Sequence, residues 1–318
     1  MKIIVTIPCQ KKHVDLLRTA CPDGEFIFTN GVPGDDLLRE AEFIIGGVPL
    51  DKLCLCKKLR FLQLSMAGSD NYAGRVPEGV ILANASGAFG LAISEHMFGA
   101  MLMLMKKLHL YRDNQTASLW QDEGRVTSVE GARVLVVGLG DIGGEFAKRC
   151  KAFGAYCIGI RRTIHDKPDY IDELHTLSDL DLLLPTADVV ALALPQSEQS
   201  KKLFNEARLR AMKQGSILLN VGRGSAVDTD ALVDVLNEGR IMASVDVTDP
   251  EPLPAEHPLW KCKNALVTPH ISGFYHLQQT HDRIVSFAAN NLHAFVTGGT
   301  IRNLVDSSTG YRTIENRF

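Results

Sequence analysis

The sequence has no apolar run long enough to cross a membrane. The longest run, Met97–Met105, ends at Lys106, whereas a membrane-spanning helix needs about 20 apolar residues. The early run Ile3–Ile7 is too short for the apolar core of a secretory signal peptide. The sequence also has no large excess of charge of either sign, because it contains 34 Lys and Arg residues and 37 Asp and Glu residues. We therefore expect a soluble, cytoplasmic protein that binds neither membranes nor nucleic acids.

The sequence lacks a cysteine pattern that is typical of a metal site. The 7 cysteines are scattered, and the pair Cys54 and Cys56 has no second Cys or His pair at the spacing of a zinc site. We interpret the cysteines as free thiols in a reducing compartment and expect no bound metal. Repeats, low-complexity tracts and Gly/Ser linkers are absent as well. A length of 318 residues then suggests about two ordinary domains.

Short apolar runs alternate with polar, helix-like stretches over the first part of the chain. The predicted strands are Ile3–Thr6, Phe26–Phe28, Phe43–Ile45, Phe61–Gln63 and Val80–Leu82. The predicted helices between them cover His13–Thr19, Asp35–Glu40 and Pro49–Lys57. This alternation predicts β-α units and a parallel sheet.

A long helix, Leu91–Tyr111, is predicted next, and a second series of β-α units begins at Arg133. The predicted strands of this series are Val134–Val137, Tyr156–Ile160, Asp188–Leu194, Ile217–Asn220, Ala243–Val247 and Ala265–Val267. Helices are expected to start near Ile142, Asn205 and Thr229, and a last helix to span Leu277–Thr297. The tail from Ser307 has no periodicity, so it is either loosely ordered or packed on a partner.

The strand that begins at Arg133 leads directly into the pattern G-x-G-x-x-G, and a helix pattern follows. In such a loop Gly138 permits a tight turn, Gly140 lets the backbone approach a pyrophosphate, and Gly143 lets helix and strand pack closely. The free N–H groups and partial positive charge of the helix amino terminus then favour phosphate binding. A glycine-rich turn without a ligand is the alternative. The flanking strand and helix favour a dinucleotide site.

Several motifs occur in order along the second part of the chain, and together they resemble one family. They are Gly138–Gly143, Ala193–Pro195, Asn220–Gly224, Asp246–Pro252 and Thr268–His270. Through them nearly the whole chain is similar to the D-isomer-specific 2-hydroxyacid dehydrogenases. The resemblance implies two Rossmann-like or flavodoxin-like parallel-sheet α/β domains with a cleft between them. Residues 1–96 and 277–318 would form the substrate (catalytic) domain, and residues 97–276 the dinucleotide-binding domain.

Three residues carry the chemistry that this resemblance implies. Arg223 follows a predicted strand, where its guanidinium can bind the carboxylate and carbonyl oxygens of a 2-oxo acid. His270, at the end of the last strand, can give a proton to the carbonyl oxygen as hydride arrives at carbon. Glu251 matches the family's partner of that histidine, and such a carboxylate favours the imidazolium and orients it. Without the resemblance, residues of these types are more often solvated or structural.

The resemblance also assigns binding roles around these three residues. Ala67 and Gly68 match small residues whose backbone N–H groups bind the substrate carboxylate, with a plain turn as the alternative. Asp246 resembles the acid on the carboxamide side of the nicotinamide. The other cofactor contacts fall on residues of the matching motifs and their neighbours: Gly138, Gly140, Asp141, Ile142, Gly143, Leu194, Pro195, Val221, Gly222, Arg223, His270, Ser272 and Gly273.

The residues after the strand Tyr156–Ile160 indicate which dinucleotide is used. NAD-specific proteins place an Asp or Glu about 20 residues past the glycine loop, where it binds the ribose 2′-hydroxyl. This chain has Arg161, Arg162 and Thr163 there, which can bind a 2′-phosphate. Alternatively the arginines are solvated, and one of the nearby aspartates, Asp166 or Asp169, reaches the ribose. We predict that NADP(H) is preferred and that NAD(H) is possible.

Together these residues predict reduction of a 2-oxo acid to a (D)-2-hydroxy acid by a nicotinamide dinucleotide. The acid is left open among glyoxylate, hydroxypyruvate and larger aliphatic or aromatic 2-oxo acids. A dinucleotide-sensing binding protein, like the corepressors that share this fold, is the alternative, and the lack of a long disordered extension disfavours it. Formate dehydrogenase is disfavoured because that branch pairs its histidine with Gln, whereas this chain has Glu251.

The Met- and Leu-rich helix Leu91–Tyr111 carries more apolar surface than one small domain readily covers. It also resembles the dimerising helix of the family. We therefore predict a two-fold symmetric homodimer with this helix at or near the interface.

Overall fold

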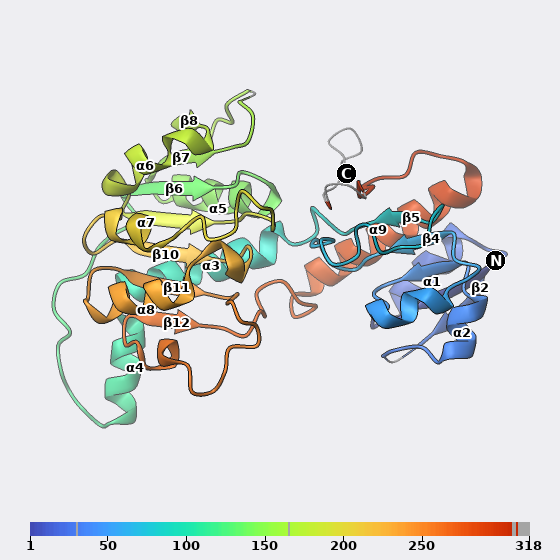
Figure 1. The fold of residues 1–318 in the computed structure, drawn as a ribbon, viewed down its shortest axis with the longest axis horizontal. Helices are drawn as coiled ribbons and strands as arrows, with labels where there is room; N and C mark the ends of the chain where they lie inside the picture. The colour runs from blue at the N-terminus through green and yellow to red at the C-terminus, as the bar shows by residue number, and fades with distance from the viewer. Residues whose placement is uncertain (30, 165, 307–309, 311–318) are drawn as a thin grey trace. The chain divides into compact units, whose positions relative to one another are not determined.

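The computed structural model describes residues 1–29, 31–164, 166–306 and 310 (Figure 1). Contacts between Cα atoms divide the chain into two units. Unit 1 comprises Met1–Phe89 and the described residues from Tyr275 onward, and unit 2 comprises Gly90–Phe274. The predicted domain boundaries lie after residues 96 and 276, whereas the chain leaves unit 1 at residue 89 and returns to it at residue 275.

Unit 1 contains a five-stranded parallel sheet with strand order β2-β1-β3-β4-β5. Its strands are β1 (Lys2–Val5), β2 (Glu25–Phe28), β3 (Phe43–Ile45), β4 (Phe61–Gln63) and β5 (Ile81–Ala83). Its helices are α1 (Lys11–Ala20), α2 (Asp35–Glu40), the 3-10 helix η1 (Leu50–Leu55) and α9 (Gln278–Thr297). Because α9 follows unit 2 in the sequence, unit 1 is built from one chain segment before unit 2 and one chain segment after it.

Side chains alternate along the strands of unit 1 and form two apolar layers. On one face Phe43 stacks on Phe61 with ring centroids 4.5 Å apart, and Phe295 of α9 packs against both rings. On the other face Ile44 belongs to a buried cluster that includes Leu38 of α2. Burial of both faces explains why these strands are continuous apolar runs in the sequence.

Unit 2 contains a seven-stranded parallel sheet with strand order β12-β11-β10-β9-β6-β7-β8. Its strands are β6 (Arg133–Val137), β7 (Tyr156–Ile160), β8 (Glu173–His175), β9 (Val189–Leu192), β10 (Ile217–Asn220), β11 (Met242–Val245) and β12 (Ala265–Val267). Its α-helices are α3 (Gly90–Met105), α4 (Leu108–Thr116), α5 (Asp141–Ala152), α6 (Leu180–Leu183), α7 (Glu206–Ala211) and α8 (Thr229–Asn237). Short 3-10 helices are η2 (Leu177–Asp179), η3 (Leu184–Thr186), η4 (Gly224–Ala226) and η5 (Pro258–Lys261).

The chain builds the sheet of unit 2 in two directions from β6. In one direction α5 connects β6 to β7, and this helix packs against α3. In the other direction the chain runs from β9 to β11 through α7 and α8, which pack against each other. In Figure 1, α3 and α5 lie on one face of this sheet, and α7 and α8 lie on the other. Ligands of parallel sheets bind outside the carboxyl ends of the strands where the strand order reverses. The reversal lies between β6 and β9, so the topology directs attention to the loops that follow these two strands.

The predicted fold class is confirmed, because each unit is an α/β structure built on a parallel sheet. Five predicted strands have the observed bounds: Phe43–Ile45, Phe61–Gln63, Tyr156–Ile160, Ile217–Asn220 and Ala265–Val267. The strand β8 was not predicted, because Glu-Leu-His has no apolar alternation and becomes a strand only by pairing with β7. The predicted helix Pro49–Lys57 is the shorter 3-10 helix η1.

The prediction of one long helix over Leu91–Tyr111 is wrong, because α3 ends at Met105 and α4 begins at Leu108. Lys107 between them has a left-handed backbone with φ 57°, which no α-helix continues through. The side chain of Lys106 donates a hydrogen bond to the carbonyl of Thr127 at 2.7 Å, and that of Lys107 donates to the carbonyl of Glu123. Both lysines therefore bind the extended segment after α4, which stabilises the break.

Within the described residues, no helix combines the length and apolar character that a membrane crossing needs. Likewise, the described His, Cys, Asp and Glu side chains form no group of three or more that could hold a metal ion. The prediction for the tail from Ser307 falls on residues outside those described, apart from Gly310.

Candidate active site

The glycine loop after β6 has the geometry of a phosphate-binding turn. Gly138 has φ 101°, and a Cβ there would stand 2.6 Å from the carbonyl oxygen of Ala193. A Cβ on Gly143 would collide with the carbonyl oxygen of Gly138, so α5 packs against the loop as closely as glycine allows. At Gly140 no described atom outside the glycine and its two chain neighbours lies within 4 Å of the position that a Cβ would take. The loop therefore leaves an open approach to the amino terminus of α5, whose free N–H groups suit a phosphate.

The side chain of Asp141 has a role that the sequence did not reveal. It begins α5, and its Oδ2 accepts a hydrogen bond from the backbone N–H of Gly90 at 2.7 Å. A Cβ on Gly90 would stand 2.5 Å from Oδ1 of Asp141. The carboxylate of Asp141 thus connects the glycine loop to the first residue of α3. Asp141 and Ile142 are the first two residues of α5, and their predicted contacts with the cofactor remain predictions.

The loops after β9 and β10 lie against each other at the same edge of the sheet. Leu194 and Pro195 follow β9, and Val221 and Gly222 follow β10. A Cβ on Gly222 would collide with the carbonyl oxygen of Leu194, so these two loops pack backbone to backbone. The structure therefore brings these four predicted cofactor residues together at one edge of the unit 2 sheet.

Arg223 is half-buried and follows directly in the loop after β10. The Nδ2 atom of Asn220 donates to the carbonyl of Arg223 at 3.0 Å, which fixes the arginine backbone. One guanidinium nitrogen of Arg223 donates to the carbonyl of Gly222 at 2.9 Å. A Cβ on Gly224 would collide with the carbonyl of Thr248, so the loop also packs against the residues after β11.

His270 and Glu251 form a close pair. His270 Nδ1 lies 2.6 Å from Glu251 Oε1, and both side chains reach solvent, with 49% and 42% of their surface exposed. An ionised carboxylate only accepts hydrogen bonds, so Nδ1 carries a proton and Nε2 is the nitrogen that is left to exchange one. Within the described parts of the chain, Nε2 has no hydrogen-bond partner. This arrangement fits a general acid or base.

The backbone of His270 is strained, because its φ is 53°, in the left-handed region. A non-glycine residue there costs about 1–3 kcal/mol and persists only when its surroundings hold it. The N–H of His270 donates to the carbonyl oxygens of Asp246 at 2.8 Å and of Thr268 at 3.0 Å. The strained residue is therefore held by the end of β11.

The carboxylate of Asp246 organises the residues on either side of His270. Its Oδ1 accepts from the Thr268 hydroxyl at 2.6 Å and from the N–H of Ile271 at 3.0 Å, and its Oδ2 accepts from the N–H and the hydroxyl of Ser272. Burial alone raises the pKa of Asp246, but these hydrogen bonds outweigh it and hold the pKa below its usual value. The predicted nicotinamide contact of Asp246 stays a prediction. Ser272 and its neighbour Gly273, also predicted cofactor residues, belong to the same turn.

Arg161, Arg162 and Thr163 follow β7, the strand that pairs with β6. The N–H of Arg161 donates to the carbonyl of His175 at 3.0 Å, and its guanidinium lies 3.4 Å from the carbonyl of Asp166. Arg162 and Thr163 are exposed. The three residues therefore lie at the carboxyl end of the strand beside the glycine loop, where the adenosine ribose binds in this type of sheet.

Ala67 and Gly68 belong to unit 1 and follow β4. Asn84 Nδ2 donates to the carbonyl of Ala67 at 2.8 Å, which holds the turn. Among the described residues, neither the N–H of Ala67 nor that of Gly68 donates a hydrogen bond. Two unpaired N–H groups in sequence suit an anion such as a carboxylate.

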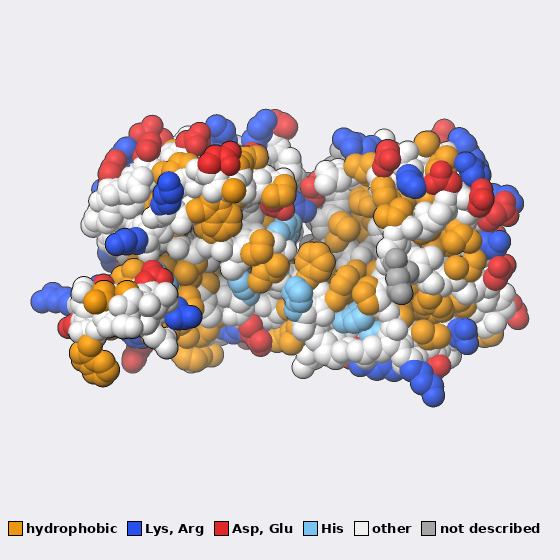
Figure 2. Space-filling view, turned by 90° about the horizontal axis from the view of Figure 1, so that it is seen from below, with side chains coloured by type: hydrophobic (Ala, Val, Ile, Leu, Met, Phe, Trp, Pro, Cys, Tyr) orange, Lys and Arg blue, Asp and Glu red, His pale blue; other side chains and the backbone are white. Residues whose placement is uncertain are grey.

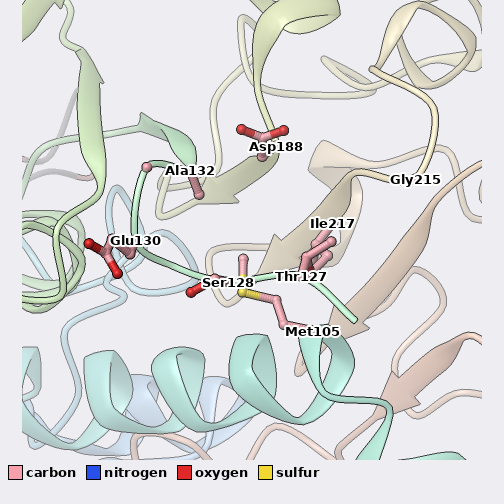
Figure 3. Close-up of a pocket in the computed structure, with 9 residues that line it drawn as sticks. Met105, Thr127, Ser128, Glu130, Ala132, Asp188, Gly215 and Ile217 are labelled. Carbon is pink, nitrogen blue, oxygen red and sulfur yellow. The ribbon is translucent and has the colours of Figure 1, made fainter. Parts of the chain in front are cut away.

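A pocket of about 230 Å³ lies at the opposite edge of the unit 2 sheet (Figure 3). Met105, the last residue of α3, lines the pocket, and its other lining residues precede or begin the strands: Thr127, Ser128, Glu130, Gly131, Ala132, Asp188, Gly215 and Ile217. No predicted site residue lines it. Asp188 in its wall is already engaged, because it accepts from the N–H of Arg133 at 2.8 Å and from Lys213 at 2.6 Å.

Comparison with known proteins finds relatives of this chain in one family. The family model described as D-isomer specific 2-hydroxyacid dehydrogenase, NAD binding domain, matches residues 98–272. A glyoxylate reductase of Korarchaeum cryptofilum is 28% identical over 92% of this chain and 90% of its own length. The crystal structure of a D-isomer specific 2-hydroxyacid dehydrogenase family protein from Aeromonas salmonicida subsp. salmonicida has 30% identity and a TM-score of 0.85, and the match covers 96% of this chain and 99% of that one. The enzyme of Xanthobacter autotrophicus Py2, in complex with NADPH and MES, has 25% identity and a TM-score of 0.81 over 98% and 99% of the two chains.

Proposed function

This chain belongs to the D-isomer specific 2-hydroxyacid dehydrogenase family, and from this premise we propose that it reduces a small 2-oxo acid to the (D)-2-hydroxy acid. It is an oxidoreductase that uses a nicotinamide dinucleotide. The observation that carries the proposal is the pair of His270 and Glu251, 2.6 Å apart, with Nε2 of the imidazole open. The relative named glyoxylate reductase supports a substrate as small as glyoxylate.

The glycine loop fits the dinucleotide that the family uses. The open space at Gly140 and the close packing at Gly143 form a cradle that any side chain would fill or disrupt. When bound, the reduced nicotinamide dinucleotide supplies the hydride. For the pyrophosphate we propose the N–H groups at the start of α5, with Gly138, Leu194, Pro195, Val221 and Gly222 forming the surrounding walls.

His270 supplies the proton in this proposal. As hydride reaches the carbonyl carbon, Nε2 of His270 gives its proton to the carbonyl oxygen, so that the C=O bond becomes a C–OH group. Glu251 keeps the proton on Nδ1 and stabilises the positive ring before the transfer. In the opposite direction Nε2 accepts the hydroxyl proton.

Arg223 binds the substrate in this proposal. The guanidinium of Arg223 binds the carboxylate and the carbonyl oxygen together, which polarises the carbonyl and orients its carbon. The unpaired N–H groups of Ala67 and Gly68 are suited to the substrate carboxylate.

A substrate panel tests the proposal. Purified protein is mixed with NADPH or NADH and with glyoxylate, hydroxypyruvate, or larger aliphatic and aromatic 2-oxo acids, and cofactor oxidation is followed by absorbance. We expect oxidation with at least one acid, and the relative kcat/KM values then rank the substrates. Dinucleotide binding without oxidation across the panel would favour a sensing protein instead.

We further propose that NADPH is preferred over NADH. Arg161, Arg162 and Thr163 present two guanidinium groups and a hydroxyl at the carboxyl end of β7, where a 2′-phosphate would lie. Each lost charge-assisted contact costs about 1.5–3 kcal/mol, or roughly ten- to a hundred-fold. Arg161→Ala or Arg162→Ala should therefore raise KM for NADPH and leave KM for NADH nearly unchanged. Equal kcat/KM for the two cofactors in the unmodified protein would contradict this preference.

We also propose that the protein is a homodimer through the region of α3 and α4. This region and the segment after α4 expose large apolar side chains, of which Trp120 is fully exposed: Met103, Leu108, Tyr111, Leu119 and Trp120. Figure 2 shows hydrophobic side chains at the surface on the face that it presents. Light scattering at micromolar concentration should give twice the chain mass of 34.9 kDa. Trp120→Asp should lower this mass, whereas Leu16→Asp, at an exposed apolar position of unit 1, should not. A monomeric mass for the unmodified protein would reject the proposal.

A further inference from the structure

The turn that carries His270, residues 268–272, is held by hydrogen bonds whose directions follow from chemistry. The hydroxyl of Thr268 has one proton, and Asp246 Oδ1 lies 2.6 Å from its oxygen. The carboxylate of Asp246 is ionised and accepts only, so the hydroxyl must donate to it. No proton of Thr268 is left for another acceptor.

A second contact of the same hydroxyl reaches α3. His96 Nε2 lies 3.4 Å from Thr268 Oγ1. Because Thr268 has already donated its proton, His96 must be the donor, and Nε2 of its imidazole carries a hydrogen. The hydrogen bonds therefore run in one direction, from His96 to Thr268 to Asp246.

The same helix is connected to the glycine loop. Gly90, the first residue of α3, donates its N–H to Asp141 at the start of α5. Gly90 and His96 lie about 9 Å apart along the helix axis. One helix thus contacts both the loop that receives the dinucleotide and the turn that carries the acid or base.

We propose that His96 and Thr268 are positioning residues for His270. His96 donates to Thr268, Thr268 donates to Asp246, and Asp246 binds the N–H groups of Ile271 and Ser272, so that His270 keeps its left-handed backbone and its contact with Glu251. Neither residue touches the reacting atoms in this proposal. As a statement about catalysis, it rests on the proposed function, because only a reductase gives His270 a proton to transfer.

Variants of Thr268 test the step next to Asp246. Thr268→Val keeps the shape and removes the hydroxyl, whereas Thr268→Ser keeps the hydroxyl. Misplacing a catalytic group by about 1 Å costs up to roughly 100-fold in rate. We expect Thr268→Val to lower kcat by about 10- to 100-fold with KM for the dinucleotide within about twofold, and Thr268→Ser to recover most of the rate. Thr297→Val is the matched control, because the one hydrogen bond of this hydroxyl among the described residues goes to the backbone carbonyl of His293, within α9.

Variants of His96 test the direction of the chain of hydrogen bonds. His96→Leu removes the donor, and His96→Gln places an amide N–H near the position of Nε2. We expect His96→Leu to lower kcat by about 3- to 10-fold, which is less than for Thr268→Val because His96 acts through Thr268. We expect His96→Gln to recover most of the rate. The double variant His96→Leu/Thr268→Val should lose no more than Thr268→Val alone. His293→Leu, at an exposed histidine that contacts a backbone carbonyl at 3.4 Å, is the matched control.

Several outcomes would overturn the proposal. Losses that multiply in the double variant would mean that His96 does not act through Thr268. A Thr268→Val enzyme with the kcat of the Thr297→Val control would mean that the hydroxyl does not position His270. If Thr268→Val does not fold, His96→Leu decides by the same criterion, and a kcat equal to that of His293→Leu overturns the proposal.

Failure of the proposed function is recognised separately, as an unmodified protein that oxidises no cofactor with any acid of the panel. Crystal structures of the unmodified protein and Thr268→Val then decide. We expect the variant to lose either the left-handed backbone of residue 270 or its contact with Glu251. An unchanged turn would overturn the inference whatever the activity.

Discussion

Each unit contains a histidine that is hydrogen-bonded to a carboxylate. The two pairs share this bond but differ in the exposure of the imidazole, in the partners of its second nitrogen and in the partners of the carboxylate. In unit 2, His270 Nδ1 lies 2.6 Å from Glu251, and 49% of the His270 side chain is exposed. In unit 1, His13 Nε2 lies 2.8 Å from Asp282, and 3% of the His13 side chain is exposed. The distances alone do not tell a reactive pair from a structural one.

The second ring nitrogen distinguishes the two pairs. His13 Nδ1 accepts the backbone N–H of Gln10 at 3.3 Å, and the ring packs against His281 with centroids 4.4 Å apart. Both nitrogens of His13 are thus engaged, and the residue joins α1 to α9. His270 has one engaged nitrogen and, within the described residues, one without a partner. A carboxylate partner becomes useful for proton transfer only where the other nitrogen is accessible.

The carboxylates differ in the same way. Lys12 first, and then His13 and Gln278, donate hydrogen bonds to Asp282 and hold its pKa well below the usual range. That carboxylate is the centre of a network between two helices. Glu251 has His270 as its one hydrogen-bond partner among the described residues. The comparison therefore predicts that changes in one pair affect activity and that changes in the other affect stability.

The largest expected effect is on turnover. His270→Ala should lower kcat by about 10²–10⁴-fold, because general acid catalysis contributes that much, while dinucleotide binding survives. His13→Ala should leave kcat within about twofold, since its ring has no free nitrogen to exchange a proton. Steady-state kinetics with a saturating 2-oxo acid and a fluorescence titration of the dinucleotide measure both. A comparable loss of kcat in the two variants would break the comparison.

The next effect is on the free energy of unfolding, and here the loss is expected for the His13 variant and not for the His270 variant. His13→Ala removes a buried ring and leaves the N–H of Gln10 without its acceptor, so the free energy of unfolding should fall by about 1–3 kcal/mol. His270→Gly should instead raise it by about 1 kcal/mol, because glycine adopts a φ of 53° without strain. Denaturant titrations of both variants check the signs. A stabilised His13→Ala protein would show that the buried pair is not structural.

A smaller effect concerns the pH dependence of the rate. Glu251→Gln removes the negative charge that favours the imidazolium form of the catalytic histidine. The limb of the kcat/KM profile that reports the acid form should therefore move toward acid. Asp282→Asn should leave the profile where it is, because Asp282 contacts His13 and not His270. Rates of reduction measured from pH 5 to 9 test this. A Glu251→Gln profile that coincides with the original would remove Glu251 from the mechanism.

The smallest effect is on the pH dependence of stability in unit 1. Burial lowers the pKa of His281, with a further lowering from His13, although its hydrogen bond to the carbonyl of Pro8 opposes this. The unfolded chain therefore takes up the proton more readily, and the stability present near neutral pH is lost as pH falls through the folded pKa. His281→Gln should make the unfolding free energy depend less steeply on pH between 5 and 7. The exposed His293→Gln should not, and equal slopes for the two variants would contradict the assignment.

Much of the fold was predictable because its signals are local. The bounds of β3 and β10 follow from apolar runs in the sequence. The turn at Gly138 follows from the glycine motif, because its φ of 101° is an angle that glycine adopts readily and other residues rarely do. The break between α3 and α4 was not predictable, because it depends on Lys106 and Lys107 reaching carbonyl groups of a segment further along the chain. The strand β8 likewise exists only as a partner of β7.

The sequence by itself determined the family, the parallel α/β class, the position of the glycine loop and the identity of His270, Glu251 and Arg223 as candidates. Each of these depends on residue type and order, which a linear chain displays directly. Only the tertiary structure decided which of the ten histidines combine a carboxylate partner with an accessible nitrogen. It also revealed that Asp141 binds Gly90 and that His96 contacts Thr268, 172 positions away. Such contacts depend on how helices and strand ends meet in space, and no local pattern in the sequence records them.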